Sequence, residues 1–159
     1  MASKMFPGSN HDHDRCVRRA LARAEQVCGE RKARLTPIRR RVLELVWSSH
    51  RPVLAYDLLD SLRDEQRRAA PPTVYRALDF LLDLGLIHRL ESLNAFVGCE
   101  DPERSHDGQF LICDACRRVA EIDAPEIGRA VDRNATGAGF EVRRRVIEVR
   151  GLCRSCRGH

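Results

Sequence analysis

The chain has 159 residues, of which 32% are charged and 43% hydrophobic, and its formal net charge is +5 at neutral pH. This length allows one large domain or two small ones, and two small domains would each bury little apolar surface, so we expect a metal ion to stabilise them. No apolar segment resembles a signal peptide or approaches the roughly 20 residues of a membrane span, which argues against a membrane protein and predicts a soluble, cytoplasmic one.

Positive charge is concentrated in the N-terminal part of the chain. Residues 1–90 contain 17 basic and 11 acidic residues, a surplus of +6, whereas residues 91–159 contain 11 and 12, a balance of −1. A nucleic-acid-binding half joined to a neutral half would show this asymmetry, but ordinary solvated helices also carry an excess this small. Charge alone therefore leaves both interpretations open.

Residues 1–13 are predicted to form a disordered N-terminal arm. The segment is polar, contains Pro7-Gly8-Ser9-Asn10 and leads into His11-Asp12-His13-Asp14. Four potential ligands in a row would also suit a metal, but ordering a polar tail costs backbone entropy, so an unstructured tail is favoured.

Two helices are expected next. Apolar residues recur at helical spacing over 14–31, where Cys16 and Cys28 are most simply packing residues. A second helix should start after the N-cap Thr36, with Pro37 in its first turn, and continue to Trp47.

The following segment predicts a winged helix-turn-helix. A third helix is expected over 55–63, and a fourth from Thr73, as N-cap, to the terminating Gly85. Two short strands, 86–90 and 95–97, should flank a turn and form the wing. We therefore assign residues 14–98 to a DNA-binding domain.

Residues 99–159 have a different pattern. Strands are expected at 109–113, 118–122 and 140–149, with a helix over 125–135. This predicts a small C-terminal α/β domain, and an α+β fold class for the whole chain.

Four cysteines form two CxxC pairs, Cys113/Cys116 and Cys153/Cys156, with 36 residues between them. Two such pairs complete a closed tetrahedral zinc site, and in a reducing cytosol metal binding is favoured over disulfides. Four thiolates around Zn²⁺ leave a charge of −2, which flanking arginines could offset; these are Arg117, Arg118, Arg154 and Arg157.

A second, mixed set of potential ligands consists of His88, Cys99, His106 and Glu121. Two imidazoles, one thiolate and one carboxylate would balance the charge of Zn²⁺. Taken singly, each residue is more simply explained as a satisfied polar side chain, and composition alone would not select these four.

Motifs occurring in a fixed order carry a family resemblance. The segments LTPIRRRVLELV, AYDLLDSLR and PPTVYRALDFLLDLGLIHRLES, followed by the two CxxC pairs, resemble the ferric uptake regulator family over about residues 20–157, and most of all its zinc-responsive members. The resemblance implies a homodimeric winged-helix repressor that binds double-stranded operator DNA. It also implies two zinc ions per chain, a structural one on the four cysteines and a regulatory one on the mixed set at the domain hinge. A soft sulfur ligand in that set favours zinc over iron.

The family's histidine-rich run before the first CxxC is reduced here to Ser105-His106-Asp107-Gly108. The resemblance therefore gives no support for a third metal site. The resemblance to zinc-responsive members implies genes for zinc uptake as the targets.

The start of the fourth helix should face the major groove. Arg76 is the best candidate for contacting a guanine, because its planar fork can donate two hydrogen bonds. Other contacts are expected from Thr73, Tyr75 and Tyr56 to bases, and from Thr36, Arg39 and Arg40 to phosphates. A solvated helix face remains the alternative for each arginine.

Three rival interpretations stay open. The same fold could sense iron or peroxide, with His50 as a substitute ligand. Cys113 and Cys116 could serve a thiol oxidoreductase, although one pair at a helix start would suffice for that and both pairs are expected at strand ends. A zinc-ribbon interaction module would leave the TPIRRR and PPTVYRAL segments unexplained.

No Ser-His-Asp arrangement or phosphate-binding glycine loop occurs in the sequence, so neither an enzyme with a small-molecule substrate nor a nucleotide-binding protein is predicted.

Overall fold

The computed structural model describes residues 6, 12–65, 69–102 and 107–158. They fall into two units, one within Pro7–Ser105 and the other made of Phe6 and residues within His106–His159. The boundary expected from the sequence lies after Gly98. The backbone N–H of Cys99 donates to the carbonyl of Leu86 at 3.0 Å, so Cys99 itself belongs to the N-terminal unit.

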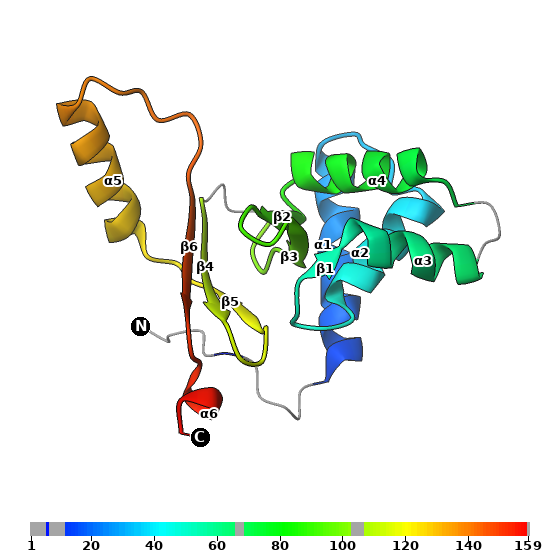
Figure 1. The fold of residues 1–159 in the computed structure, drawn as a ribbon. Coiled ribbons are helices and arrows are strands. Elements are labelled where there is room, and N and C mark those ends of the chain that lie inside the picture. Colours follow the sequence, from blue (N-terminus) through cyan, green and yellow to red (C-terminus); the bar gives the residue numbers. More distant parts are fainter. Residues whose placement is uncertain (1–5, 7–11, 66–68, 103–106, 159) are drawn as a thin grey trace. The chain divides into compact units, whose positions relative to one another are not determined.

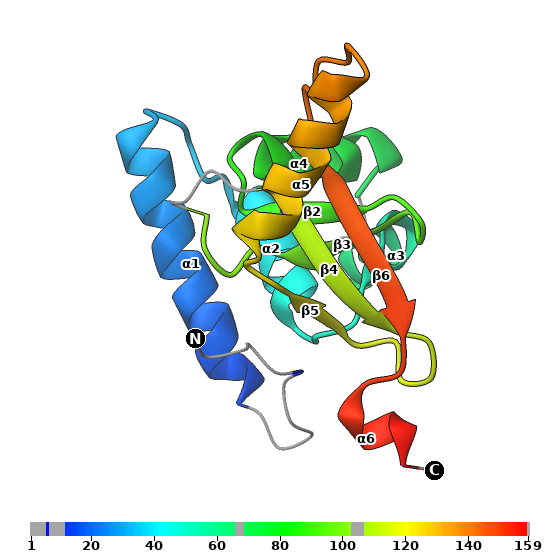
Figure 2. The same cartoon turned by 90° about the vertical axis from the view of Figure 1, so that its left-hand side faces the viewer.

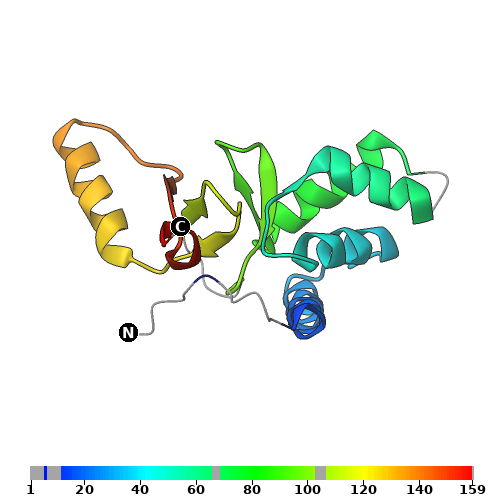
Figure 3. The same cartoon turned by 60° about the horizontal axis from the view of Figure 1, so that its bottom comes forward.

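Four helices make up most of the N-terminal unit (Figure 1). They are α1 (His13–Glu30), α2 (Pro37–Trp47), α3 (Ala55–Glu65) and α4 (Pro71–Asp83). Helix α2 contacts α1, α3 and α4, and Figure 3 shows α1 nearly end-on beside α2.

Helix α1 begins inside the predicted arm. The carboxylate of Asp12 accepts a hydrogen bond from the backbone N–H of Arg15 at 3.1 Å, so Asp12 is an N-cap and His13 is the first helical residue. The rest of the predicted arm, apart from Phe6, lies outside the described residues.

Helix α4 starts two residues before its predicted N-cap. Ala70 is the N-cap and Pro71 the first helical residue, so the prediction of Thr73 as N-cap is wrong. Proline is favoured at this position because its missing N–H would have no helical partner there. Gly85 has φ +69°, a conformation that suits glycine just beyond the end of a helix.

A three-stranded antiparallel sheet completes the unit. Its order is β1-β3-β2, with β1 at Val53–Leu54, β2 at Ile87–Leu90 and β3 at Ala95–Gly98. The hairpin of β2 and β3 is the predicted wing, in which His88 pairs with Val97. The prediction missed β1, because two residues are too few to show an alternating pattern.

The core of this unit comes from all four helices and the wing. A Cβ added at Gly98 would overlap the indole of Trp47, so this position in β3 excludes any side chain. Residues with at most 1% exposure include Ala24, Val42, Leu43, Val46, Leu58, Leu62, Val74, Leu78, Leu81 and Ile87. These features confirm the predicted winged-helix fold.

The C-terminal unit is a three-stranded mixed sheet with two helices. Strand β4 (Gly108–Cys113) lies between β5 (Val119–Glu121) and β6 (Val146–Gly151), antiparallel to the first and parallel to the second (Figure 2). Helix α5 (Pro125–Gly137) connects β5 to β6, and the short α6 (Arg154–Arg157) follows. The α+β class is confirmed.

The predicted strand over 140–149 is wrong in its first part, since β6 starts at Val146. The register explains this start, because Val146 pairs with Gly108, the first residue of β4, and the ladder between the two strands ends there. Among the described residues, no helix is long and apolar enough to cross a membrane.

Candidate metal centres and DNA-contacting helix

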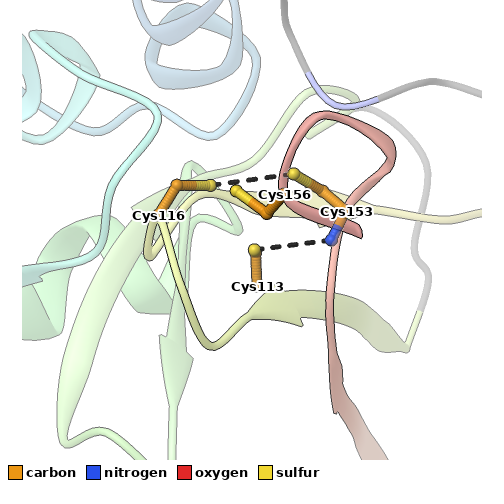
Figure 4. A group of neighbouring side chains, drawn as sticks. All are labelled: Cys113, Cys116, Cys153 and Cys156. Atoms are coloured by element: carbon orange, nitrogen blue, oxygen red, sulfur yellow. Dashed lines mark hydrogen bonds between the residues drawn. The ribbon is translucent and has the colours of Figure 1, made fainter. Parts of the chain in front are cut away.

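The two CxxC pairs come together at one end of the C-terminal sheet. Cys113 ends β4 and Cys116 lies in the turn toward β5, while Cys153 and Cys156 belong to the segment after β6. Figure 4 shows the four side chains converging from these two segments. The second pair was expected at a strand end, but Cys153 is instead the N-cap of α6.

The spacing of the four sulfur atoms fits a tetrahedral zinc site. All four lie within 4.8 Å of one another, and the Sγ atoms of Cys116 and Cys153 are 3.8 Å apart. Zinc–sulfur bonds of about 2.3 Å in a tetrahedron place sulfur atoms about 3.8 Å apart. Cys113 and Cys153 are buried and the other two are half-buried, so the arrangement is closed, as in structural sites.

Hydrogen-bond donors around the cluster favour thiolates. Backbone N–H groups of Cys116 and Cys153 lower the pKa of Cys113 to about 6, the second donating to its Sγ at 3.4 Å. Burial raises the pKa of Cys116, but hydrogen bonds from Arg118, including Nε to Sγ at 3.4 Å, bring it below its ordinary value. Arg118 therefore acts as one of the expected offsetting cations.

The last proton of the cluster is hard to remove without a cation. The neighbouring thiol of Cys153, followed by burial, raises the pKa of Cys156 to about 12. A divalent cation reverses this effect, because it deprotonates the thiols that coordinate it. Four converging sulfur atoms suit a thiophilic divalent metal better than a redox centre, which needs only one pair of cysteines.

The wing brings two of the predicted regulatory ligands together. His88 lies in β2, and Cys99 directly follows β3, its partner strand. A ring nitrogen of His88 and the Sγ of Cys99 lie within 4.8 Å of each other, with Cys99 only 3% exposed. The guanidinium of Arg23 donates to the carbonyl of Glu100, which fixes the backbone beside Cys99.

The other two predicted regulatory ligands belong to the C-terminal unit. Glu121 is the last residue of β5 and pairs with Phe110 of β4, and its side chain is half-buried. His106 lies outside the described residues.

The start of α4 exposes the residues expected to contact DNA. Tyr75 is 55% exposed, Arg76 is exposed and Thr73 is half-buried. Tyr56, in the first turn of α3, is 67% exposed. The intervening Val74 is buried in the core, so it is not available to a ligand.

Two of the three predicted phosphate contacts already have partners within the unit. The guanidinium of Arg39 lies 3.6 Å from the ring centroid of Phe80 and donates to the carbonyl of Arg34 at 2.7 Å. Arg40 forms an ion pair with Glu25 on α1. Thr36 is the N-cap of α2, without a side-chain capping bond.

His50, the substitute ligand of the rival iron or peroxide interpretation, lies beside the start of α1. Its ring centroid is 5.0 Å from that of His13. His50 is therefore placed against a residue of the predicted arm, a relationship that sequence spacing gives no means to anticipate.

Similarity to known proteins agrees with this geometry. The family model described as "Ferric uptake regulator family" matches residues 30–150. The zinc uptake regulation protein of Escherichia coli (strain K12) is 44% identical over 137 residues, covering 86% of this chain and 80% of that protein. This chain belongs to the ferric uptake regulator family.

Members of the family differ in similarity to this chain. A solved structure described as a zinc uptake regulator complexed with zinc and DNA has a TM-score of 0.85 and 43% identity, covering 89% of this chain and 95% of that one. The peroxide-responsive repressor PerR of Staphylococcus epidermidis is only 23% identical over 138 residues, covering 84% of this chain and 89% of that protein. The predicted family resemblance is confirmed.

Proposed function

We propose that this chain is a zinc-responsive transcriptional repressor that binds operator DNA as a dimer and controls genes for zinc uptake. The observation that carries the proposal is that the His88 imidazole and the buried Cys99 thiol lie within 4.8 Å of each other, at the wing. A thiolate with an imidazole in a small, closed donor set prefers Zn²⁺ to the harder ions that iron sensors select. The 44% identity to a zinc uptake regulation protein supports the same choice of metal.

Two zinc ions per chain are part of this proposal. The first is held by Cys113, Cys116, Cys153 and Cys156 and stabilises the C-terminal unit. The second is the regulatory ion, and His106 and Glu121 join His88 and Cys99 as its ligands. This donor set supplies one thiolate and one carboxylate, which together balance the ion's charge.

Dimerisation through the C-terminal unit follows from an uncovered apolar surface. Helix α5 buries only Gly128, and Ile127, Val131 and Phe140 are 37%, 39% and 67% exposed. Apolar patches of this kind mark interaction sites. A second copy of the chain is the proposed partner, and its binding face is a groove that Asn134, Arg144 and Arg145 also line. The apolar lining of this groove consists of Ile127, Ala130, Val131, Ala135, Phe140, Val142, Val146 and Ile147.

DNA binding is assigned to the exposed start of α4. Arg76 contacts a base edge, with Tyr75, Thr73 and Tyr56 beside it, and Thr36, Arg39 and Arg40 contact phosphates. Because Arg39 and Arg40 already have partners in the unit, their phosphate contacts would share or replace these interactions. Arg76 is therefore the most important of the seven for sequence recognition.

Zinc binding at the regulatory site and DNA binding are thermodynamically linked under this proposal. Occupancy of the regulatory site favours the dimer geometry that fits successive major grooves, so zinc and DNA strengthen each other's binding. Low zinc then releases the operator. The chain acts in the cytoplasm and catalyses no reaction under this proposal.

A titration of DNA binding against different metals tests the proposal. A duplex is first selected from a random library with the zinc-loaded chain, and binding is then followed by fluorescence anisotropy at buffered free zinc, iron(II) or manganese(II). We expect binding to rise with zinc at the lowest free concentration. Tighter binding with iron, or loss of binding on peroxide treatment of the iron form, would instead identify an iron or peroxide sensor.

A further inference from the structure

Arg145 makes an unusually complete set of contacts for a residue outside the two metal centres. Its side chain is only 20% exposed. Nε donates to Oδ2 of Asp107 at 2.8 Å, and Nη1 donates to the carbonyl of Gly128 at 2.9 Å. Asp107 also receives Nη2, and Asp132 forms an ion pair with Nη1. The guanidinium thus joins Asp107, the residue directly before β4, to helix α5.

Gly128 gives the guanidinium access to the backbone of α5. A Cβ at this position would come within 3.3 Å of both Cζ and Nη2 of Arg145, closer than an ordinary contact. Glycine in the interior of a helix costs roughly 1 kcal/mol relative to alanine, so its presence here has a packing reason. The close approach of Arg145 supplies one.

Asp107 is the contact that matters for regulation. It directly follows His106, one of the proposed regulatory ligands, and directly precedes β4. A hydrogen-bonded carboxylate at this position restricts the backbone directly beside that ligand. The hydrogen bond to the carbonyl of Gly128 fixes the other end of the interaction on α5, part of the proposed dimer face. The ion pair with Asp132, whose side chain is 49% exposed, is expected to contribute little.

We propose that Arg145 is a positioning residue for the regulatory zinc site, because it binds Asp107, the residue that directly follows the ligand His106 in the sequence, and ties Asp107 to α5. The proposal rests on the function proposed above. Groups that orient metal ligands typically change metal affinity by 10–100-fold when removed, so the effect is measurable.

The sign of the effect separates positioning from simple electrostatics. Removing a cation near a metal site should strengthen binding of Zn²⁺ if charge repulsion dominates. Loss of positioning should weaken it. Arg145→Gln is therefore expected to bind the second zinc about tenfold more weakly, not more tightly.

Zinc affinity of the full chain is measured by competition with a chromophoric chelator, while total zinc, sedimentation and thermal unfolding report the structural site, the dimer and the fold. Asp107→Asn should weaken the second zinc as much as Arg145→Gln, and the double variant should add no further loss. Gly128→Ala, which keeps every charge but crowds the guanidinium, should weaken binding of the second zinc too.

Asp132→Asn and Arg143→Gln are matched controls, since Asp132 does not border a ligand and Arg143 has an 87% exposed side chain. Both should keep the original affinity.

Each failure has a distinct meaning. A wild-type chain that binds one zinc only would defeat the proposed function itself. A wild-type chain with two zincs, whose second affinity is unchanged or raised in Arg145→Gln and Asp107→Asn, would overturn the role of Arg145 alone. A merely structural role predicts that Asp132→Asn lowers zinc affinity as much as Asp107→Asn. If Arg145→Gln does not fold, Asp107→Asn and Gly128→Ala decide the question.

Discussion

The sulfur atoms of Cys116 and Cys153 lie 3.8 Å apart, although 37 positions separate the two residues in the chain. Bringing thiols from two distant segments together costs loop-closure entropy and crowds ionisable groups. A structural zinc ion offsets both costs, because its binding free energy is also folding free energy.

Cys113→Ser is expected to remove the structural zinc and unfold the C-terminal unit. Such a site contributes on the order of 10 kcal/mol, comparable to the whole stability of a small domain. Zinc content and sedimentation velocity measure the outcome. Cys16→Ser, half-buried on α1 and outside the cluster, is the control and should keep both zinc and dimer. A stable zinc-free dimer of Cys113→Ser would show that the cluster does not hold the unit together.

Cys99→Ser is expected to keep a folded dimer with one zinc per chain. Serine is a much weaker zinc ligand than a thiolate, so the variant should lose zinc-dependent DNA binding while the structural site stays filled. Metal analysis and anisotropy with the selected duplex report the two effects separately. Zinc-dependent binding that survives this substitution would place the sensor elsewhere.

Arg76→Ala should lose sequence preference more than general affinity. A bidentate contact from arginine to guanine contributes about 1–3 kcal/mol of discrimination, so preference for the selected duplex over a scrambled one should fall by roughly 5–150-fold. Arg40→Ala is the comparison, because removing a phosphate-binding side chain should weaken binding to both duplexes equally and reduce its salt dependence. Unchanged preference in Arg76→Ala would remove α4 as the specificity element.

Gly98→Ala tests the packing of the wing. The added Cβ would overlap the Trp47 indole, and overpacking of a core costs typically 1–3 kcal/mol. Urea unfolding should show this decrease in stability. Gly29→Ala, which meets no atom within 4 Å, should be neutral or stabilising. Equal stability of the two variants would contradict the close contact between β3 and α2.

Phe140→Asp should weaken the dimer. Phe140 is 67% exposed beside the apolar face of α5, and a carboxylate there would be buried without a partner if a second copy covers it. Sedimentation equilibrium should show a higher dissociation constant, with both zincs retained. Glu141→Gln, which leaves the apolar face intact, is its control. An unchanged dimer would exclude this face as the interface.

The local patterns in the sequence predict most of the fold. Apolar periodicity places all four helices of the N-terminal unit, and the paired cysteines indicate one metal cluster before any contact is known. The prediction errors have two kinds of cause. The last strand starts later than predicted because its pairing with β4 begins only at Gly108 and Val146, a long-range register that local pattern does not give. The start of α4 depends on two competing local signals: Pro71 takes the first helical position, although the hydroxyl of Thr73 makes that residue the better cap by type.

Parts of the candidate site are less visible in the sequence. His88 and Cys99 meet because β2 and β3 pair in a particular register, and spacing alone does not define register. Their selection as ligands depended on family resemblance, as did that of Glu121 and His106. Arg145 and Arg23 had no motif to mark them, since each acts through a contact that only the folded chain creates.

Linkage between zinc and DNA is the central claim, and the zinc affinity of the same sample with and without DNA tests it most directly. Chelator competition gives the affinity of the second zinc for the free dimer and for the dimer saturated with the selected duplex. We expect DNA to raise this zinc affinity by the same factor by which zinc raises the affinity for DNA. Equal zinc affinities in the two states, with the second zinc bound in both, would contradict it.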